Sequence, residues 1–216
     1  MSKKLFIIFK VVVILNLLIC LVNKEWTATF ICLFNFILFF IEDYVQIKLG
    51  YNNFFKLLIY MFLIASLVGG EVYYLYVRIK YFDIIMHTLS SFITSGLFVY
   101  VAMFFKVNIN KWLYIICIFS FAIMVASLWE IVEFSIDRLF DSDMQKDTII
   151  YEINSVKLSN DSKTIVSKRI ESTKFDSFII NGYLDIGLYD TIEDMICAVI
   201  GSVLCLCIMK KKKLLN

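Results

Sequence analysis

The sequence predicts an all-α integral membrane protein, a six-helix transmembrane bundle that carries one small extracytoplasmic insertion. Of its 216 residues, 61% are hydrophobic, 19% are charged and none is proline. Soluble domains average about 45–50% apolar and about 25% charged residues, so a mean hydropathy of +0.82 excludes an ordinary soluble or disordered chain. The net charge of +2 offers no basic field for a nucleic acid, which leaves the lipid bilayer as the predicted partner.

Six stretches are long and apolar enough to span the bilayer. A helix needs ~20 apolar residues to cross about 30 Å of hydrocarbon. Backbone groups in lipid must bond internally, and these stretches lack the alternation of barrel strands, so they are predicted to be helices. We assign the whole chain, 1–216, to a single transmembrane domain with spans at about 5–22, 26–41, 54–70, 83–105, 112–134 and 188–209.

The lysines beside these spans predict the orientation, because basic residues concentrate in cytoplasmic loops. With the N-terminus inside, the short outer loops hold only Lys24, Arg78 and Lys80. The cytoplasmic side then holds most of the basic residues that flank the spans, namely Lys3, Lys4, Lys48, Lys56, Lys106, Lys111 and Lys210 to Lys213. We therefore expect both termini to be cytoplasmic. The wealth of Lys, Ile, Asn and Phe and the scarcity of Arg indicate the plasma membrane of a low-GC bacterium.

The segment 138–187 is the one polar part of the chain, with 15 of the 40 charged residues. Residues 148–156 and 163–170 are rich in β-branched side chains and flank a Ser-Asn-Asp-Ser turn signal, and Asn181-Gly182 is a second turn signal. We expect a small β-hairpin cap on the outer face, with a mobile linker as the alternative.

Ionisable residues inside the spans form the candidate site. Acidic and basic side chains at such depth cost ~2.5–3.5 kcal/mol each, so they require an explanation. Within each of the last three spans they recur at i, i+3 or i+4, which places them on one face of the helix, and the predicted topology puts all of them at the outer end. The candidate metal ligands are Asp83, His87, Glu130, Glu133, Asp137, Asp190 and Asp194, and the candidate catalytic residues are His87, Glu130 and Glu133.

Six carboxylates and an imidazole cannot all stay charged in one small site, since like charges 4 Å apart repel by about 4 kcal/mol at an effective dielectric constant near 20. A divalent cation, protonated carboxylates or pairing with Arg78, Lys80 or Arg138 would relieve the repulsion. The donor set suits Zn²⁺, Mn²⁺ or Ca²⁺, although it matches no specific metal motif and no HExxH is present. Helix capping at the membrane interface explains Asp83, Asp137 and Asp190 well. It explains His87, Glu130, Glu133 and Asp194 poorly, because these lie a turn or more inside.

Two further patterns concern packing and the opposite membrane face. Small residues continue the polar stripes inward, such as Ser91 on the fourth helix, Ser127 on the fifth and Gly201 on the sixth, which predicts that these faces pack closely on one another. Glu42 and Asp43 follow the second apolar stretch, and we interpret them as a solvated boundary at its cytoplasmic end.

Three motifs in order carry a family resemblance. Tyr-Phe-Asp-Ile-Ile-Met-His ends at His87, Trp-Glu-Ile-Val-Glu-Phe begins at Trp129, and Asp-Thr-Ile-Glu-Asp-Met begins at Asp190, followed by Gly201. This pattern resembles the YjdF-like family of bacterial multi-pass inner-membrane proteins, a domain of unknown function, over about residues 54 to 205. The resemblance implies a fold and a location rather than an activity. VanZ-like envelope proteins show a fainter likeness.

Three function classes remain open. The first is an outer-face site, either a metal-dependent enzyme or a ligand-binding site that acts on envelope or lipid substrates. The second is a structural or accessory protein whose charged cluster holds the bundle together. The third is a proton- or cation-coupled transporter, against which the apolar cytoplasmic halves and the missing prolines argue. The sequence identifies no protein partner, substrate or reaction.

Overall fold

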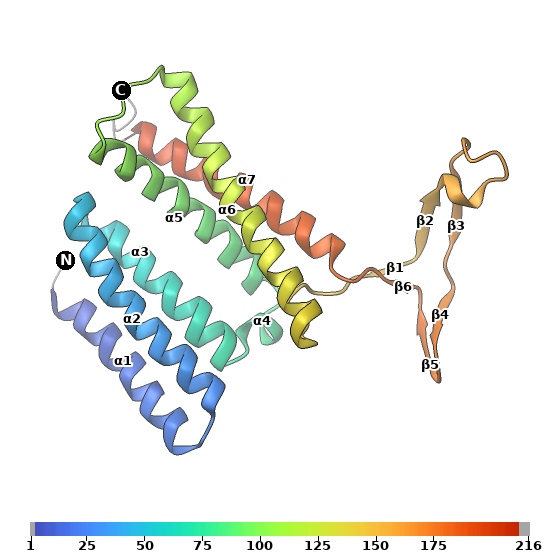
Figure 1. Cartoon of the computed structure of the whole chain (residues 1–216), viewed down its shortest axis with the longest axis horizontal. Coiled ribbons are helices and arrows are strands. Elements are labelled where there is room, and N and C mark those ends of the chain that lie inside the picture. The colour runs from blue at the N-terminus through green and yellow to red at the C-terminus, as the bar shows by residue number, and fades with distance from the viewer. Residues whose placement is uncertain (1–2, 212–216) are drawn as a thin grey trace. The chain divides into compact units, whose positions relative to one another are not determined.

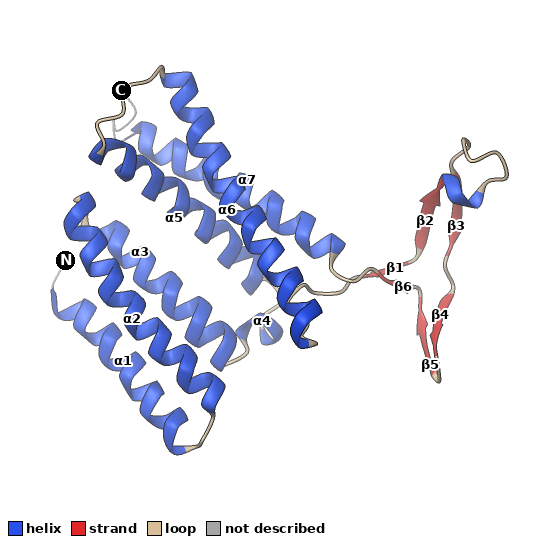
Figure 2. Cartoon of the chain, viewed as in Figure 1, coloured by secondary structure: helices blue, strands red, loops and turns tan. Residues whose placement is uncertain are grey.

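The computed structural model describes residues 3–211. Lys212 and Lys213, which belong to the predicted cytoplasmic lysine run, lie outside the described residues. Within that range six helices are long and apolar enough to cross a membrane (Figures 1 and 2), at Lys4–Val22, Trp26–Leu49, Asn53–Val72, Phe82–Phe104, Lys111–Phe140 and Leu188–Met209. The chain divides into two compact units. One comprises the residues up to Ala126 and those from Met195 onward, and the other is Ser127–Asp194. The six predicted spanning helices and the strand insertion are thus confirmed.

Helices α1 (Lys3–Val22) and α2 (Trp26–Leu49) pack side by side in the first unit (Figure 1). Their shared core with the third span contains fully buried Val13, Cys32 and Phe39. Helix α2 continues well beyond residue 41, where the sequence predicted its end, and stops at Gly50 in a left-handed conformation that suits glycine. The prediction was too short because it interpreted Glu42 and Asp43 as a solvated boundary, whereas both lie within the helix.

The third span changes its helical pitch halfway. Asn52 caps helix α3 (Asn53–Leu63) by accepting backbone N–H bonds from Phe54 and Phe55. From Ile64 to Val72 the chain then continues as a π-helix, η1. A change of pitch interrupts the regular ladder of backbone bonds. At this junction the buried side chain of Asn35 in α2 donates its Nδ2–H to the carbonyl oxygen of Leu63, at 2.6 Å.

We expect Asn35→Leu to lower the free energy of unfolding by about 1 kcal/mol, the usual worth of an interhelical hydrogen bond in a membrane. The η1 amides should also exchange faster with deuterium, because the junction loses its polar anchor. Phe34→Leu at an exposed neighbouring position is the matched control. Equal unfolding midpoints for the two variants in detergent would refute the role of Asn35.

After the short α4 (Leu75–Arg78), α5 (Phe82–Phe104) packs closely against α7 (Leu188–Lys211). A Cβ atom added to Gly201 would lie 2.2 Å from the backbone oxygen of Thr88 and 3.0 Å from the Cβ of Ser91. The predicted close packing is therefore confirmed for the fourth and sixth spans. Cys205 and Met209, farther along α7, lie in the core of this unit.

The second unit joins the end of α6 (Lys111–Phe140) to three antiparallel strand pairs, and α6 continues past the predicted end at residue 134. The pairs are β1 (Ile149–Ile150) with β6 (Tyr183–Leu184), β2 (Glu152–Ser155) with β3 (Val166–Arg169), and β4 (Ser172–Phe175) with β5 (Phe178–Asn181). The predicted Asn181-Gly182 turn is the junction of β5 with β6, where Gly182 has a φ of 91°. The short turn of that region lies instead at Asp176, between β4 and β5.

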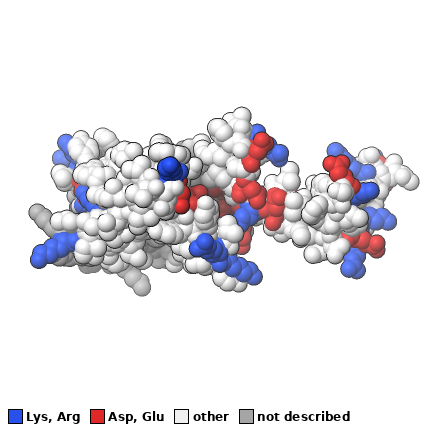
Figure 3. Space-filling view, turned by 90° about the horizontal axis from the view of Figure 1, so that it is seen from below, with Lys and Arg blue, Asp and Glu red and all other residues white. Residues whose placement is uncertain are grey.

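Charge is distributed as a membrane protein requires. On the face drawn in Figure 3, wide areas of the helices carry neither acidic nor basic side chains, whereas the strand segment carries both. Large apolar side chains such as Ile47 and Trp112 are 80% and 74% exposed. Water would strongly disfavour so much exposed apolar surface, so lipid is the environment that this surface fits.

Candidate metal centre

Three of the predicted acidic residues come together in the second unit. Glu130 and Glu133 are one helical turn apart on α6, and Asp194 lies on the second turn of α7. One carboxylate oxygen from each lies within 4.8 Å of the other two. Their exposed fractions are 6%, 7% and 2%, so water reaches them poorly. The i, i+3 spacing on α6 is what aims both glutamates at the same place.

Neighbouring side chains orient two of these carboxylates. The indole N–H of Trp129 donates to Glu133 Oε1 at 2.6 Å. The side-chain amide of Gln145 donates to Glu130 Oε2 at 3.4 Å and to the hydroxyl of Thr191 at 2.7 Å. Sequence reasoning missed Gln145, because it lies in a loop with no periodicity that could have placed it beside α6 and α7.

Glu130 also carries an atom that the protein leaves unsatisfied. Its Oε1 is buried and has no hydrogen-bond partner among the described residues. A buried carboxylate oxygen without a partner costs free energy, and such atoms in a native structure require an explanation. A cation bound by the three carboxylates would supply the missing partner.

Asp137 and Asp190 anchor backbone instead. The carboxylate of Asp137 accepts the backbone N–H groups of Met144 and Gln145 at 2.7 and 2.9 Å. Asp190 accepts the backbone N–H of Lys146 at 2.9 Å. These bonds fasten the loop after α6 to both helices and so position the Gln145 side chain. Among the described residues of this unit, the metal-competent group consists of Glu130, Glu133 and Asp194.

Asp83 and His87 form a pair within the first unit. They lie one turn apart at the start of α5, with His87 Nε2 3.4 Å from Asp83 Oδ1, and both side chains are mostly buried. The carboxylate can orient the imidazole ring, as it does for many histidines that bind metals. That this pair shares one site with the α6 and α7 carboxylates remains a prediction from the sequence.

The residues present fit a divalent cation. Three buried carboxylates supply oxygen ligands within 4.8 Å of one another, and oxygen ligands alone suit the hard ions Mn²⁺, Mg²⁺ and Ca²⁺. An additional nitrogen ligand would shift the preference toward Zn²⁺. The identity of an ion bound there would therefore report on the make-up of the site.

Six apolar helices with acidic side chains buried at a helix end define a multi-pass membrane protein. The family described as predicted membrane protein (DUF2238) matches residues 2–212, and the chain belongs to this family. It is the same family as the YjdF-like proteins, so the resemblance seen in the sequence is confirmed, while the likeness to VanZ-like proteins remains unconfirmed. Searches of curated proteins and of solved structures gave no significant match.

Proposed function

We propose that this protein binds a divalent metal ion through Glu130, Glu133 and Asp194 and uses the centre on envelope or lipid substrates. The observation that carries the proposal is the buried carboxylate group with the unsatisfied Glu130 Oε1. The lysine bias along the chain favours a plasma-membrane location with both termini cytoplasmic, which would place the centre toward the outer leaflet.

The chain's own residues would have distinct tasks at this centre. Glu130, Glu133 and Asp194 would hold the ion, Trp129 would fix the Glu133 carboxylate, and Gln145 would orient Glu130. A bound divalent ion supplies Lewis-acid activation of a phosphoryl or carbonyl oxygen. In the first unit, His87, the single histidine of the chain, is the general base that the sequence predicts, and Asp83 would orient its ring.

We expect the purified full chain to bind about one Mn²⁺ ion, and Glu130→Gln to weaken this binding at least about tenfold, because it removes a charged ligand at an unchanged size. Glu193→Gln is the matched control, since Glu193 is the exposed neighbour of Asp194. Mn²⁺ titration followed by electron paramagnetic resonance measures both. Equal affinity of the Glu130→Gln and Glu193→Gln variants, with both folded, would overturn the metal centre.

The same sample tests the place of His87. Because the chain has one histidine, a nitrogen coupling in the pulsed spectrum of bound Mn²⁺ identifies that residue when the expression tag has been removed. The coupling should vanish in His87→Ala. A spectrum without nitrogen coupling in the wild-type protein would exclude His87 from the ligand set and leave an all-carboxylate centre.

The second candidate is a structural role, favoured by the bonds from Asp137 and Asp190 to backbone N–H groups. In that case the acidic residues hold the loop and helices together without a ligand. Glu130→Gln would then leave metal content unchanged and alter the thermal unfolding midpoint alone. A proton- or cation-coupled transporter is the third candidate. Uptake of a solute into proteoliposomes, driven by a proton or cation gradient, would reveal it.

A further inference from the structure

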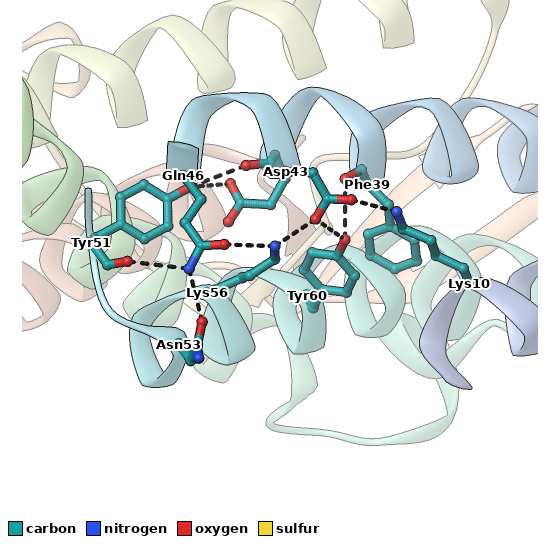
Figure 4. Close-up of polar contacts among 9 residues, drawn as sticks. Lys10, Phe39, Asp43, Gln46, Tyr51, Asn53, Lys56 and Tyr60 are labelled. Atoms are coloured by element: carbon teal, nitrogen blue, oxygen red, sulfur yellow. Dashed lines mark hydrogen bonds and ion pairs between the residues drawn. The ribbon is translucent and has the colours of Figure 1, made fainter. Parts of the chain in front are cut away.

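A second polar cluster lies in the first unit, where the start of α1, the end of α2 and the start of α3 meet (Figure 4). Lys10 comes from α1, Asp43 and Gln46 from α2, and Lys56 from α3. Asp43 was predicted to lie in a solvated boundary, but its carboxylate binds both lysines and accepts a hydrogen bond from Tyr60 at 2.8 Å. The boundary prediction is wrong, because residues remote in sequence supply these partners.

Two lysines of this cluster, Lys10 and Lys56, share a single carboxylate, that of Asp43. Lys10 contacts Asp43 Oδ2, and Lys56 lies 2.5 Å from Asp43 Oδ1. Lys56 also donates to Gln46 Oε1 at 2.7 Å. The neighbouring acid, Glu42, accepts instead from the hydroxyl of Tyr51 at 2.5 Å. An ammonium group has three donors, so both lysines can engage a further acceptor.

These lysines face a cavity of about 460 Å³. Its polar wall contains Lys10, Asp43, Gln46 and Lys56, and its apolar wall contains Phe6 and Ile47. The wall therefore carries two ammonium groups against one carboxylate, beside a larger apolar surface. Such a cavity suits an amphiphilic anion rather than a neutral solute.

The position of the cavity also matches the headgroup region of a bilayer. It lies within the first turns of α1 and α3 and the last turns of α2, close to the helix ends. Lysine at such a depth extends its ammonium group toward the interface, where lipid phosphates lie. Here the two lysines turn instead toward each other across Asp43 (Figure 4), so a single ligand beside Asp43 could reach both ammonium groups.

We propose that this cavity is a binding site for a phosphate monoester, with the phosphate between Lys10 and Lys56 and any attached chain along Phe6 and Ile47. The site is independent of the carboxylate centre and would exist whether or not that centre binds metal. Phosphate suits the two lysines because its oxygens can accept from both ammonium groups at once. A lipid headgroup and a soluble phosphate ester share this chemistry.

The test titrates the purified full chain in neutral detergent with short-chain phosphatidic acid, glycerol 3-phosphate, inorganic phosphate and short-chain phosphatidylcholine, and follows the thermal unfolding midpoint. We expect saturable stabilisation by phosphatidic acid and none by phosphatidylcholine. If the natural ligand is a lipid, phosphatidic acid should bind more tightly than glycerol 3-phosphate, because its acyl chains add apolar contact. Equal binding of the two assigns the site to a soluble ester. Stabilisation by phosphatidylcholine equal to that by phosphatidic acid would overturn the proposal.

Substitutions distinguish a phosphate site formed by the lysines from an ion pair with Asp43 that only stabilises the fold. Lys10→Gln and Lys56→Gln should each weaken phosphatidic acid binding about tenfold. Lys48→Gln is the control and should leave phosphatidic acid binding unchanged. Lys48 lies at the same end of α2, but its Nζ lies over the Tyr44 ring. Asp43→Asn should strengthen binding, because it removes the competing carboxylate, although it lowers the basal midpoint.

Lys56→Arg keeps the charge and should retain binding, which covers the case in which Lys56→Gln does not fold. Unchanged affinity in Lys10→Gln, or weaker binding in Asp43→Asn, would overturn a phosphate site shared by the two lysines.

Discussion

Replacing Gly201 by alanine is expected to destabilise the protein more than any other single methyl group added to its helices. The new Cβ would lie 2.2 Å from the carbonyl oxygen of Thr88 and 3.0 Å from the backbone nitrogen of Phe92. Backbone atoms cannot rotate away as a side chain can, so α5 and α7 would have to separate. Overpacking of this kind costs about 1–3 kcal/mol and sometimes more. Thermal or denaturant unfolding of the detergent-solubilised protein measures the loss.

Leu204→Ala is the control for this experiment, because Leu204 lies on the same helix with 48% of its surface exposed. It should change the midpoint little. Gly201→Ser should behave like Gly201→Ala, since the clash involves Cβ. Equal midpoints for Gly201→Ala and Leu204→Ala would mean that the close approach of α5 and α7 is absent in the protein.

Asp185→Ala is expected to open the base of the strand insertion. The carboxylate of Asp185, 7% exposed, accepts backbone N–H bonds from Thr148 at 2.8 Å, Tyr189 at 2.7 Å and Gly187 at 3.3 Å. It thereby joins the β1–β6 pair to the start of α7. Hydrogen bonds to a charged group contribute about 1.5–3 kcal/mol each, although not additively, so we expect a local loss of about 3 kcal/mol.

Hydrogen–deuterium exchange measures this loss at the amides of Thr148 and Asp185, which should exchange more than about a hundredfold faster. Asp161→Ala is the control. Asp161 accepts bonds from Lys163 and Thr164 within the loop between β2 and β3, and its removal should leave the Thr148 amide protected. Equal exchange rates of the Thr148 amide in the Asp185→Ala and Asp161→Ala variants would contradict the role of Asp185 as an anchor.

The same anchor predicts a dependence on pH. Burial raises the pKa of Asp185, but the backbone N–H groups of Thr148, Tyr189 and Gly187 outweigh burial and hold the pKa below its ordinary value. A depressed folded-state pKa adds stability that is complete above the unfolded pKa, about 3.9, and is lost as the pH falls through the folded value. Protection of Thr148 should therefore decrease below about pH 4, and Asp185→Asn should remove this acid-dependent step.

The carboxylate centre shows how far local spacing can predict a site. The i, i+3 interval of Glu130 and Glu133 places them on one face of a helix, and the structure brings Asp194 to the same face. Asp137 and Asp190 obey the same spacing, yet they bind backbone N–H groups of residues 144 to 146. Spacing cannot distinguish the two uses, because the loop that supplies those N–H groups has no pattern of its own.

The lysine cluster illustrates the opposite case. Glu42 and Asp43 follow an apolar stretch, and nothing in their neighbourhood in the sequence indicates that Lys10 and Lys56 will reach them. An ion pair between residues of different helices depends on which faces meet, and hydropathy carries no information on that rotation. The π-helix η1 was likewise not predicted from the sequence. It lies in a span without proline and contains two adjacent glycines, Gly69 and Gly70.

By itself the sequence determined the six helices and their apolar character, because backbone groups in a bilayer must bond within their own segment and about 20 apolar residues leave few alternatives. It also predicted that helices with small residues approach closely, and the structure places that approach at Gly201. Only the tertiary structure decided which charges became partners: Asp43 with two lysines, Asp137 with backbone, and Glu130 with one oxygen unsatisfied. The physical reason is that charge pairing depends on distances of a few ångströms between helices, which periodicity along one helix does not encode.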